Sequence, residues 1–223
     1  AALAAAPTLF AARDAWLFNP DDRRGWGGKG DYGTARYAAD NPPHGAVFGY
    51  YLPEDLRTLQ ERRREEEKER AAEGGDNPYP DWEQLRREDR EEPPSITLTV
   101  RDAAGEIVRR IDGAADKGFH RVAWDMRYPA PDPVTLAPRT DYAPWEGKPQ
   151  GPMALPGTYS VTLSRRVEGR WEDLAGPQEF SLKPLFTGGL VAEDRNDVLE
   201  FQAATAELYR AVSGADRAAA EIE

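Results

Sequence analysis

The stretch that most constrains the fold is residues 117–128, KGFHRVAWDMRY. Apolar and charged side chains alternate along it, with Val122, Trp124 and Met126 on one face and Arg121, Asp125 and Arg127 on the other. A period of two over this length is typical of a β-strand that buries one face. Trp124 is the largest apolar group on that face, so we expect it to anchor a core.

Other alternating stretches predict that the chain is mainly β. Pro156 and Gly157 predict a turn, after which Tyr159, Val161 and Leu163 alternate toward the interior. The remaining predicted strands cover residues 46–52, 95–101, 106–111, 170–174 and 178–182. These strands predict a β-sandwich to which the rest of the chain is attached.

Two of these runs, GFHRVAWDMRYP at 118–129 and GPMALPGTYSVTL at 151–163, are separated by a long loop. Together with PTLFAARDAWLF, NPPHGAVFGYYL and FSLKPL, they resemble the module that follows the β-propeller in secreted bacterial proteins. Those proteins carry BNR or sortilin-type repeats and are often labelled glycosyl hydrolases. The resemblance implies an Ig-like or fibronectin-type-III-like β-sandwich, exported to the periplasm or the extracellular space.

The composition along the chain predicts three parts. Residues 1–44, with glycines crowded between positions 25 and 33, read as a connector from a preceding domain. Residues 45–186 read as the β-sandwich, interrupted by a helical insertion at 53–93, and residues 187–223 as a C-terminal helix. The opening AALAAAP without an initiator methionine predicts a piece of a longer chain.

The insertion contains LRTLQERRREEEKERAAE, a strong helix former with almost no apolar residue after Leu59. Opposite charges are spaced for i,i+4 ion pairs at Arg57 and Glu61, Arg62 and Glu66, and Glu66 and Arg70. A second short helix is predicted around Trp82 and Leu85. We therefore expect a charged, hairpin-like excursion that stands in solvent or touches a partner.

The C-terminal segment changes to a helical period. Its apolar and small residues recur at spacings of three and four: Val198, Phe201, Thr205, Leu208, Val212, Ala215, Ala219 and Ile222. This pattern predicts a helix with one apolar seam, and a lone helix of this kind is marginal in water. The seam therefore needs another helix, from the same chain, as the resemblance implies, or from a second subunit.

Charge and composition exclude several functions. The net charge of −11 argues against a nucleic-acid partner, and no apolar run is long enough to span a membrane. The chain has no cysteine, and His44 and His120 share no motif, so we expect no cofactor and no metal. Asp102, Asp125, Asp132 and Asp141 are carboxylates of the type that glycosidases use, but the propeller's Ser-x-Asp-x-Gly-x-x-Trp signature does not occur.

These observations leave three hypotheses for function. The first is a non-catalytic accessory module that contacts the preceding propeller or another subunit. The second is a carbohydrate-binding module in which Trp26, Tyr142 or Trp145 stacks on a polysaccharide. The third is a hydrolase whose active site borrows one residue from this module; the chain alone is not expected to be an enzyme.

Overall fold

The computed structural model describes residues 6–19, 42–135, 143, 148–186 and 192–220. About 35% of these residues lie in strands and about 29% in helices, so the prediction of a mainly β chain is right only in part. The strands are β1 Thr8–Leu9, β2 Ala15–Leu17, β3 Ala46–Leu52, β4 Ser95–Asp102, β5 Ile107–Gly113, β6 Gly118–Trp124, β7 Gly157–Val167 and β8 Arg170–Pro184. The helices are α1 Leu59–Ala72, α2 Trp82–Arg90 and α3 Ala192–Ala220.

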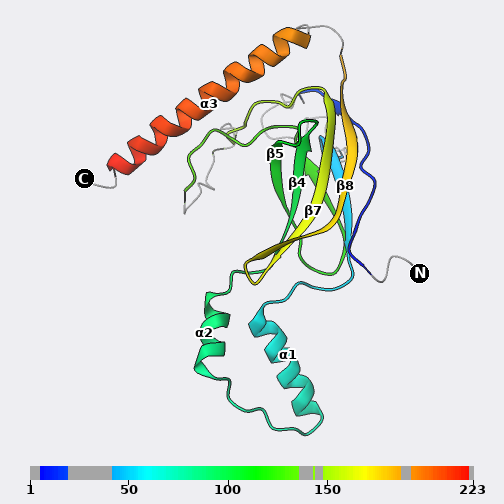
Figure 1. Ribbon diagram of the computed structural model, residues 1–223, viewed down its shortest axis with the longest axis vertical. Helices are drawn as coiled ribbons and strands as arrows, with labels where there is room; N and C mark the ends of the chain where they lie inside the picture. The colour runs from blue at the N-terminus through cyan, green and yellow to red at the C-terminus, as the bar shows by residue number, and fades with distance from the viewer. Residues whose placement is uncertain (1–5, 20–41, 136–142, 144–147, 187–191, 221–223) are drawn as a thin grey trace, which may run out of the picture.

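The strands form two sheets, one of them curled into a half-barrel. The smaller sheet has the order β1-β3-β6 and the larger one the order β2-β8-β7-β4-β5. Neighbouring strands are antiparallel except β2, which runs parallel to β8. The helices lie at opposite ends of the sheets: α1 and α2 project from one end, and α3 crosses the other (Figure 1).

One core is shared by side chains of both sheets. Residues 46–52 form the predicted strand, β3, and every second residue of it is buried, as in a strand with one face toward a core. Phe48 of β3 packs edge-on against Phe180 of β8, with ring centroids 5.2 Å apart. Trp124 lies beside Tyr159 and Phe180, at 5.5 and 6.2 Å, which confirms its place in the core.

The strand predicted over 117–128 ends earlier, at Trp124. Met126 has a φ of +59°, which breaks the alternation, and Asp125 Oδ1 accepts a hydrogen bond from Arg127 N at 3.1 Å. Met126 is nevertheless buried, because its carbonyl accepts from Ala154 N at 2.8 Å and holds the segment in place. The local turn, rather than strand alternation, therefore directs Met126 into the core.

Part of the segment predicted as a connector is built into the sheets. Leu9 of β1 and Ala15 of β2 belong to the core, so residues 8–9 and 15–17 are not an irregular linker. Gly45, at the start of β3, has a φ of +106°, and a Cβ there would lie 1.8 Å from Trp124 O. The two strands predicted at 170–174 and 178–182 form the single strand β8.

Candidate interaction surface

The less apolar face of α3 is the one turned toward the rest of the molecule. The half-buried residues of α3 recur on this face at helical spacing: Arg195, Leu199, Ala206, Arg210, Ser213 and Gly214. The helix comes close to the loop after β6 at Gly214, where a Cβ would lie 3.9 Å from Pro133 Cβ. Only one residue of the set, Leu199, has a large apolar side chain.

The apolar seam of α3 lies on the opposite face and is exposed. Phe201, Leu208 and Val212 are 71%, 65% and 61% exposed. At 3.6 residues per turn, Phe201 lies about half a turn around the helix from Leu199. Contiguous apolar surface of this kind marks interaction sites in soluble proteins, so this exposed face of α3 is the leading candidate for a functional surface.

A cavity of about 310 Å³ lies between the first turns of α3 and the sheets. Its lining is mostly apolar and includes Leu17, Met153, Leu155 and Pro184 from the body and Val198 and Leu199 from α3. Arg195 and Gln202 are the polar groups that line it. The cavity is at the small end of ligand-site volumes, and it shows where the beginning of α3 sits against the body.

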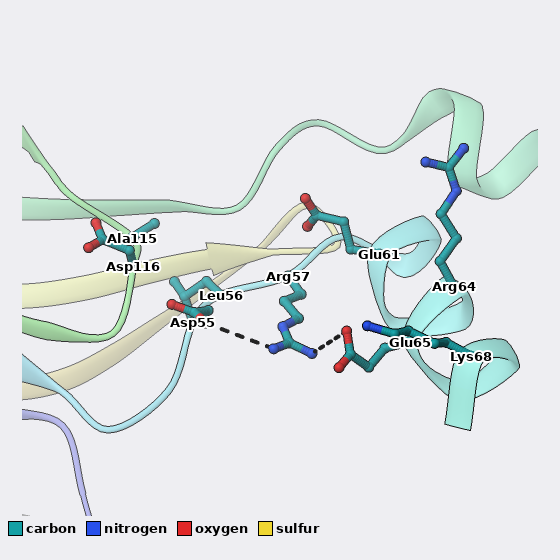
Figure 2. A pocket seen from close by; sticks show the side chains of 9 residues that line it. All are labelled: Asp55, Leu56, Arg57, Glu61, Arg64, Glu65, Lys68, Ala115 and Asp116. Carbon is teal, nitrogen blue, oxygen red and sulfur yellow. Dashed lines mark ion pairs between the residues drawn. The ribbon is translucent and has the colours of Figure 1, made fainter. Parts of the chain in front are cut away.

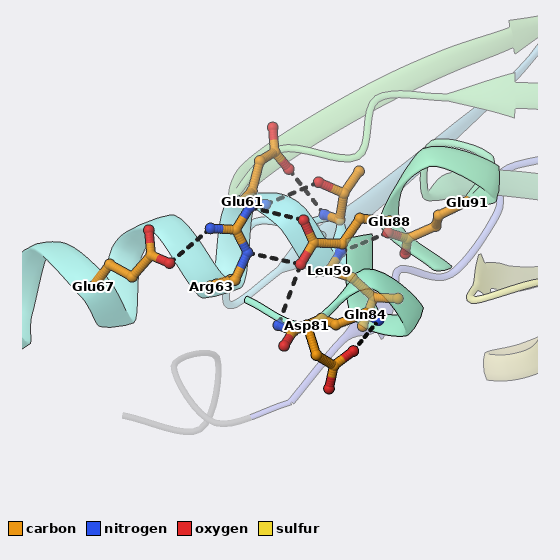
Figure 3. Close-up of polar contacts among 9 residues, drawn as sticks. Leu59, Glu61, Arg63, Glu67, Asp81, Gln84, Glu88 and Glu91 are labelled. Carbon is orange, nitrogen blue, oxygen red and sulfur yellow. Dashed lines mark hydrogen bonds and ion pairs between the residues drawn. The ribbon is translucent and has the colours of Figure 1, made fainter. Parts of the chain in front are cut away.

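The helical insertion is held together by a charged network instead of an apolar core (Figure 3). Arg63 of α1 binds Glu88 of α2 with two parallel hydrogen bonds, Nε to Oε1 at 2.7 Å and Nη2 to Oε2 at 2.8 Å. Arg63 also donates to Glu67 at 2.7 Å. The guanidinium of Arg63 holds the pKa of Glu88 below its ordinary value, and the two carboxylates raise the pKa of Arg63.

The end of α2 also caps the start of α1. Glu91 accepts a hydrogen bond from Leu59 N at 2.6 Å, and Thr58 and Glu61 form a reciprocal capping box. Unpaired N–H groups at a helix start are stabilised by such acceptors. The Arg63–Glu88 ion pair and the helix cap from Glu91 therefore join the two helices, although neither helix has a fully buried apolar residue.

The arginines of the predicted i,i+4 ion pairs contact other groups, and Arg70 donates to Asn77 Oδ1 at 3.1 Å. Arg57 lies 3.5 Å from Glu65 and 3.9 Å from Asp55, while Arg62 pairs with Glu168 in the β7–β8 turn. Figure 2 shows Arg57 in a crevice of about 580 Å³ at the base of the insertion, lined mainly by charged residues of both signs. The carboxylates that line the crevice, Asp55, Glu61, Glu65 and Asp116, outnumber its cations, Arg57, Arg64 and Lys68, so the crevice has no preference for an anion.

Aromatic rings gather on the outer face of the smaller sheet. Tyr51 and Phe119 are opposite each other in the β3–β6 register, with ring centroids 4.8 Å apart. Phe10 stacks against Phe119 at 5.9 Å, and it lies over Gly49, where a Cβ would be 3.5 Å from its ring. Phe119 is exposed, so this aromatic cluster offers a ring face to solvent.

The stacking residues predicted from the sequence, Trp26, Tyr142 and Trp145, lie outside the described residues, as does Asp141. Asp102 and Asp125 each accept backbone hydrogen bonds in a local turn. His44 Nε2 lies 3.2 Å from Phe18 O, and His120 Nε2 lies 2.7 Å from Asp116 O. Within the described part of the chain, no group of three or more potential metal ligands comes together.

Comparisons with known proteins give no relative: no family model, no curated protein and no solved structure matches this chain. Among the helices that the structure describes, none combines the length and the apolar content needed to cross a membrane.

Proposed function

We propose that this chain is a non-catalytic accessory module of an exported, propeller-bearing protein, and that it serves docking, spacing or assembly through α3. The sequence resemblance supplies the context of a secreted propeller protein, in the periplasm or outside the cell. The exposed face of α3 supplies the contact. Its partner is another protein surface, either the preceding propeller or another subunit, and the acidic net charge disfavours nucleic acid.

The exposure of Phe201, Leu208 and Val212 is the observation that carries the proposal. Each such side chain gains about 1.5–3 kcal/mol when it moves from water into an apolar contact. Leaving three of them on one face of one helix is costly unless a partner covers them. A partner that covers this face therefore explains the exposed apolar residues, which the packing of α3 against the body leaves uncovered.

The fold proposed for the body is an Ig-like or fibronectin-type-III-like sandwich. Two sheets that share one core support this proposal, as does the contact of Phe48 with Phe180 between them. In such a module the strands form a rigid support, and the segments at the two ends make the contacts.

The proposal is tested by sedimentation velocity over a range of concentrations, on the chain alone and mixed with a purified BNR-repeat propeller. A Leu208→Asp/Val212→Asp double variant should weaken the observed association at least about tenfold, since each charge would be buried unpaired. Ala203→Asp places one of the same charges on α3 away from the seam and should leave association unchanged. An absence of any association, with itself or the propeller, would contradict the proposal.

The second candidate function is carbohydrate binding, favoured by the aromatic cluster of Phe10, Tyr51 and Phe119. An exposed aromatic face stacks on the apolar face of a sugar ring, and Phe119 offers such a face. Titration calorimetry against a panel of polysaccharides tests this function. Saturable binding that Phe119→Ala removes and Leu208→Asp leaves intact would favour it over docking through α3.

A further inference from the structure

We infer that the cavity between the first turns of α3 and the sheets binds a small monocarboxylate with an apolar tail, held by Arg195. This site is distinct from the docking surface proposed above, because it lies on the side of α3 that faces the body. Three features support it: an apolar wall, a volume suited to a small ligand, and a guanidinium with no ion partner in the described part of the chain.

Apolar side chains from distant parts of the chain form most of the wall. Leu17 ends β2, Pro184 ends β8, and residues 153–156 lead into β7. Leu199 closes the cavity from the side of α3. A concave apolar space with a few polar groups is the usual form of a small-molecule site.

Among the described residues that line the cavity, Arg195 alone carries a charge. It is half-buried, and its own helix offers it no acid, because the positions three and four residues away are Val191, Ala192, Val198 and Leu199. No carboxylate of the described part of the chain pairs with it. A partly buried cation is costly without a partner, and the carboxylate of a ligand would supply one.

The guanidinium also indicates the class of head group. Its planar fork matches a carboxylate through two parallel hydrogen bonds, the arrangement that Arg63 and Glu88 form elsewhere in this molecule. One cation balances one negative charge, whereas a phosphate monoester carries about −1.5 to −2 near neutral pH. The single arginine therefore favours a monocarboxylate over a phosphate.

The volume of the cavity sets the size of the tail. Its volume of about 310 Å³ corresponds to roughly ten water molecules at about 30 Å³ each. An apolar acid of about ten non-hydrogen atoms, such as octanoate, occupies a space of this order. Gln202, the other polar group that lines the cavity, is exposed and therefore lies at its rim.

Titration calorimetry tests the site with three probes: octanoate, octanol, which lacks the charge, and acetate, which lacks the tail. Octanoate should bind saturably, one molecule per chain, below the concentration at which it forms micelles. It should bind at least about tenfold more tightly than octanol, because the charged head group pairs with Arg195. Acetate should show no saturable binding, because it covers none of the apolar wall.

Arg195→Gln separates the charge from the cavity. It should weaken octanoate binding about tenfold and change octanol binding by less than about twofold. Arg217→Gln is the matched control, since it removes the same charge from an exposed position near the end of α3 and should leave both probes unaffected. Octanoate binding that is absent, no tighter than that of octanol, or insensitive to Arg195→Gln would overturn the inference.

Amide chemical shifts locate the bound octanoate independently of affinity. The largest changes should fall on residues 153–156 and 195–202. Changes centred on Leu208 and Val212 would place octanoate on the exposed face of α3 and overturn the site. Because Leu208 lies on that other face, Leu208→Asp should leave octanoate binding intact, so the cavity and the docking surface can fail separately.

Discussion

Trp124 connects the two sheets through its ring and holds the turn after β6 through its indole nitrogen. The residue is 1% exposed, and its Nε1 donates a hydrogen bond to Arg127 O at 3.0 Å. It therefore fills the space between strands and also fixes the turn that follows β6. A smaller side chain would leave a cavity and an unpaired carbonyl at the same place.

Trp124→Ala is accordingly expected to lower the free energy of unfolding by about 3–5 kcal/mol. Urea denaturation measures the change, and Trp82→Ala is the matched control because Trp82 is 73% exposed on α2. The control should change stability by less than about 1 kcal/mol. If the Trp124 variant unfolded at the same urea concentration as the native chain, this account of the core would be wrong.

Glu88 makes the insertion sensitive to acid. Its pKa is lowered by Arg63, so the folded state favours the charged carboxylate. The resulting stability is fully present above the ordinary value of 4.5, and it is lost as the pH falls through the lower folded value. Amide exchange in α1 and α2, corrected for intrinsic rates, should show Glu88→Gln less protected than the native chain at pH 6.

This difference between Glu88→Gln and the native chain should disappear in strong acid, where both carry a neutral side chain at position 88. Glu66→Gln is the control, since Glu66 is exposed on α1 and should behave as the native chain at both pH values. A difference that persisted in strong acid, below the lowered folded pKa of Glu88, would show that the Arg63–Glu88 pair is not the cause.

At the scale of elements, the insertion is separable from the sheets. Its base is the exception, because Leu56 packs against the core and its N–H donates to Ala115 O at 3.0 Å. Replacing residues 57–92 with a short Gly/Ser linker should therefore keep the melting temperature within a few degrees. The lost ion pairs to the body, Arg62–Glu168 and Arg166–Glu92, lie at the surface, where Arg166 is partly exposed, and they contribute little. A molten or aggregated product in calorimetry would contradict this.

The elements that could be predicted are those whose pattern is local. β3 occupies the predicted residues because an apolar run follows a turn rich in proline and glycine, and the hairpin of β4 and β5 follows from the turn between them. β1 and β2 could not be predicted, since two or three residues carry no periodic signal and their partners, β3 and β8, lie far along the chain. The early end of β6 depends on a left-handed residue, Met126, that no glycine marks.

The candidate surface could also be predicted from the sequence only in part. The seam of α3 could be read from its spacing, but its direction relative to the body depends on tertiary packing. The pairing of Arg63 with Glu88 joins residues 25 positions apart on two helices, and no local spacing indicates it. Likewise, Tyr51 and Phe119 meet only through the register of β3 and β6.

For the molecule as a whole, the two ends differ in the chemistry of the contacts they offer. The charged insertion lies at one end of the sheets and the apolar face of α3 at the other (Figure 1). The salt dependence of association distinguishes these two kinds of contact, because salt screens exposed charges and leaves apolar contacts intact.

Association through α3 should therefore persist between about 0.1 and 1 M sodium chloride, because salt does not screen apolar contacts. Light scattering at fixed protein concentration measures the extent of association at each salt concentration. Dissociation of the complex at 1 M salt, together with insensitivity to Leu208→Asp, would assign the contact to the insertion instead.

The polar junction between α1 and α2 also affects how the hairpin opens. The heat capacity of unfolding and the slope against denaturant both scale with the surface that becomes exposed. Because neither helix has a fully buried side chain, and Leu59 and Leu85 are only half-buried, detaching the hairpin exposes little apolar surface. Urea should therefore scarcely change how often the hairpin opens, while cold, heat and denaturant act mainly on the sheets. The hairpin thus forms a local unfolding unit whose opening is governed by protons and ionic strength.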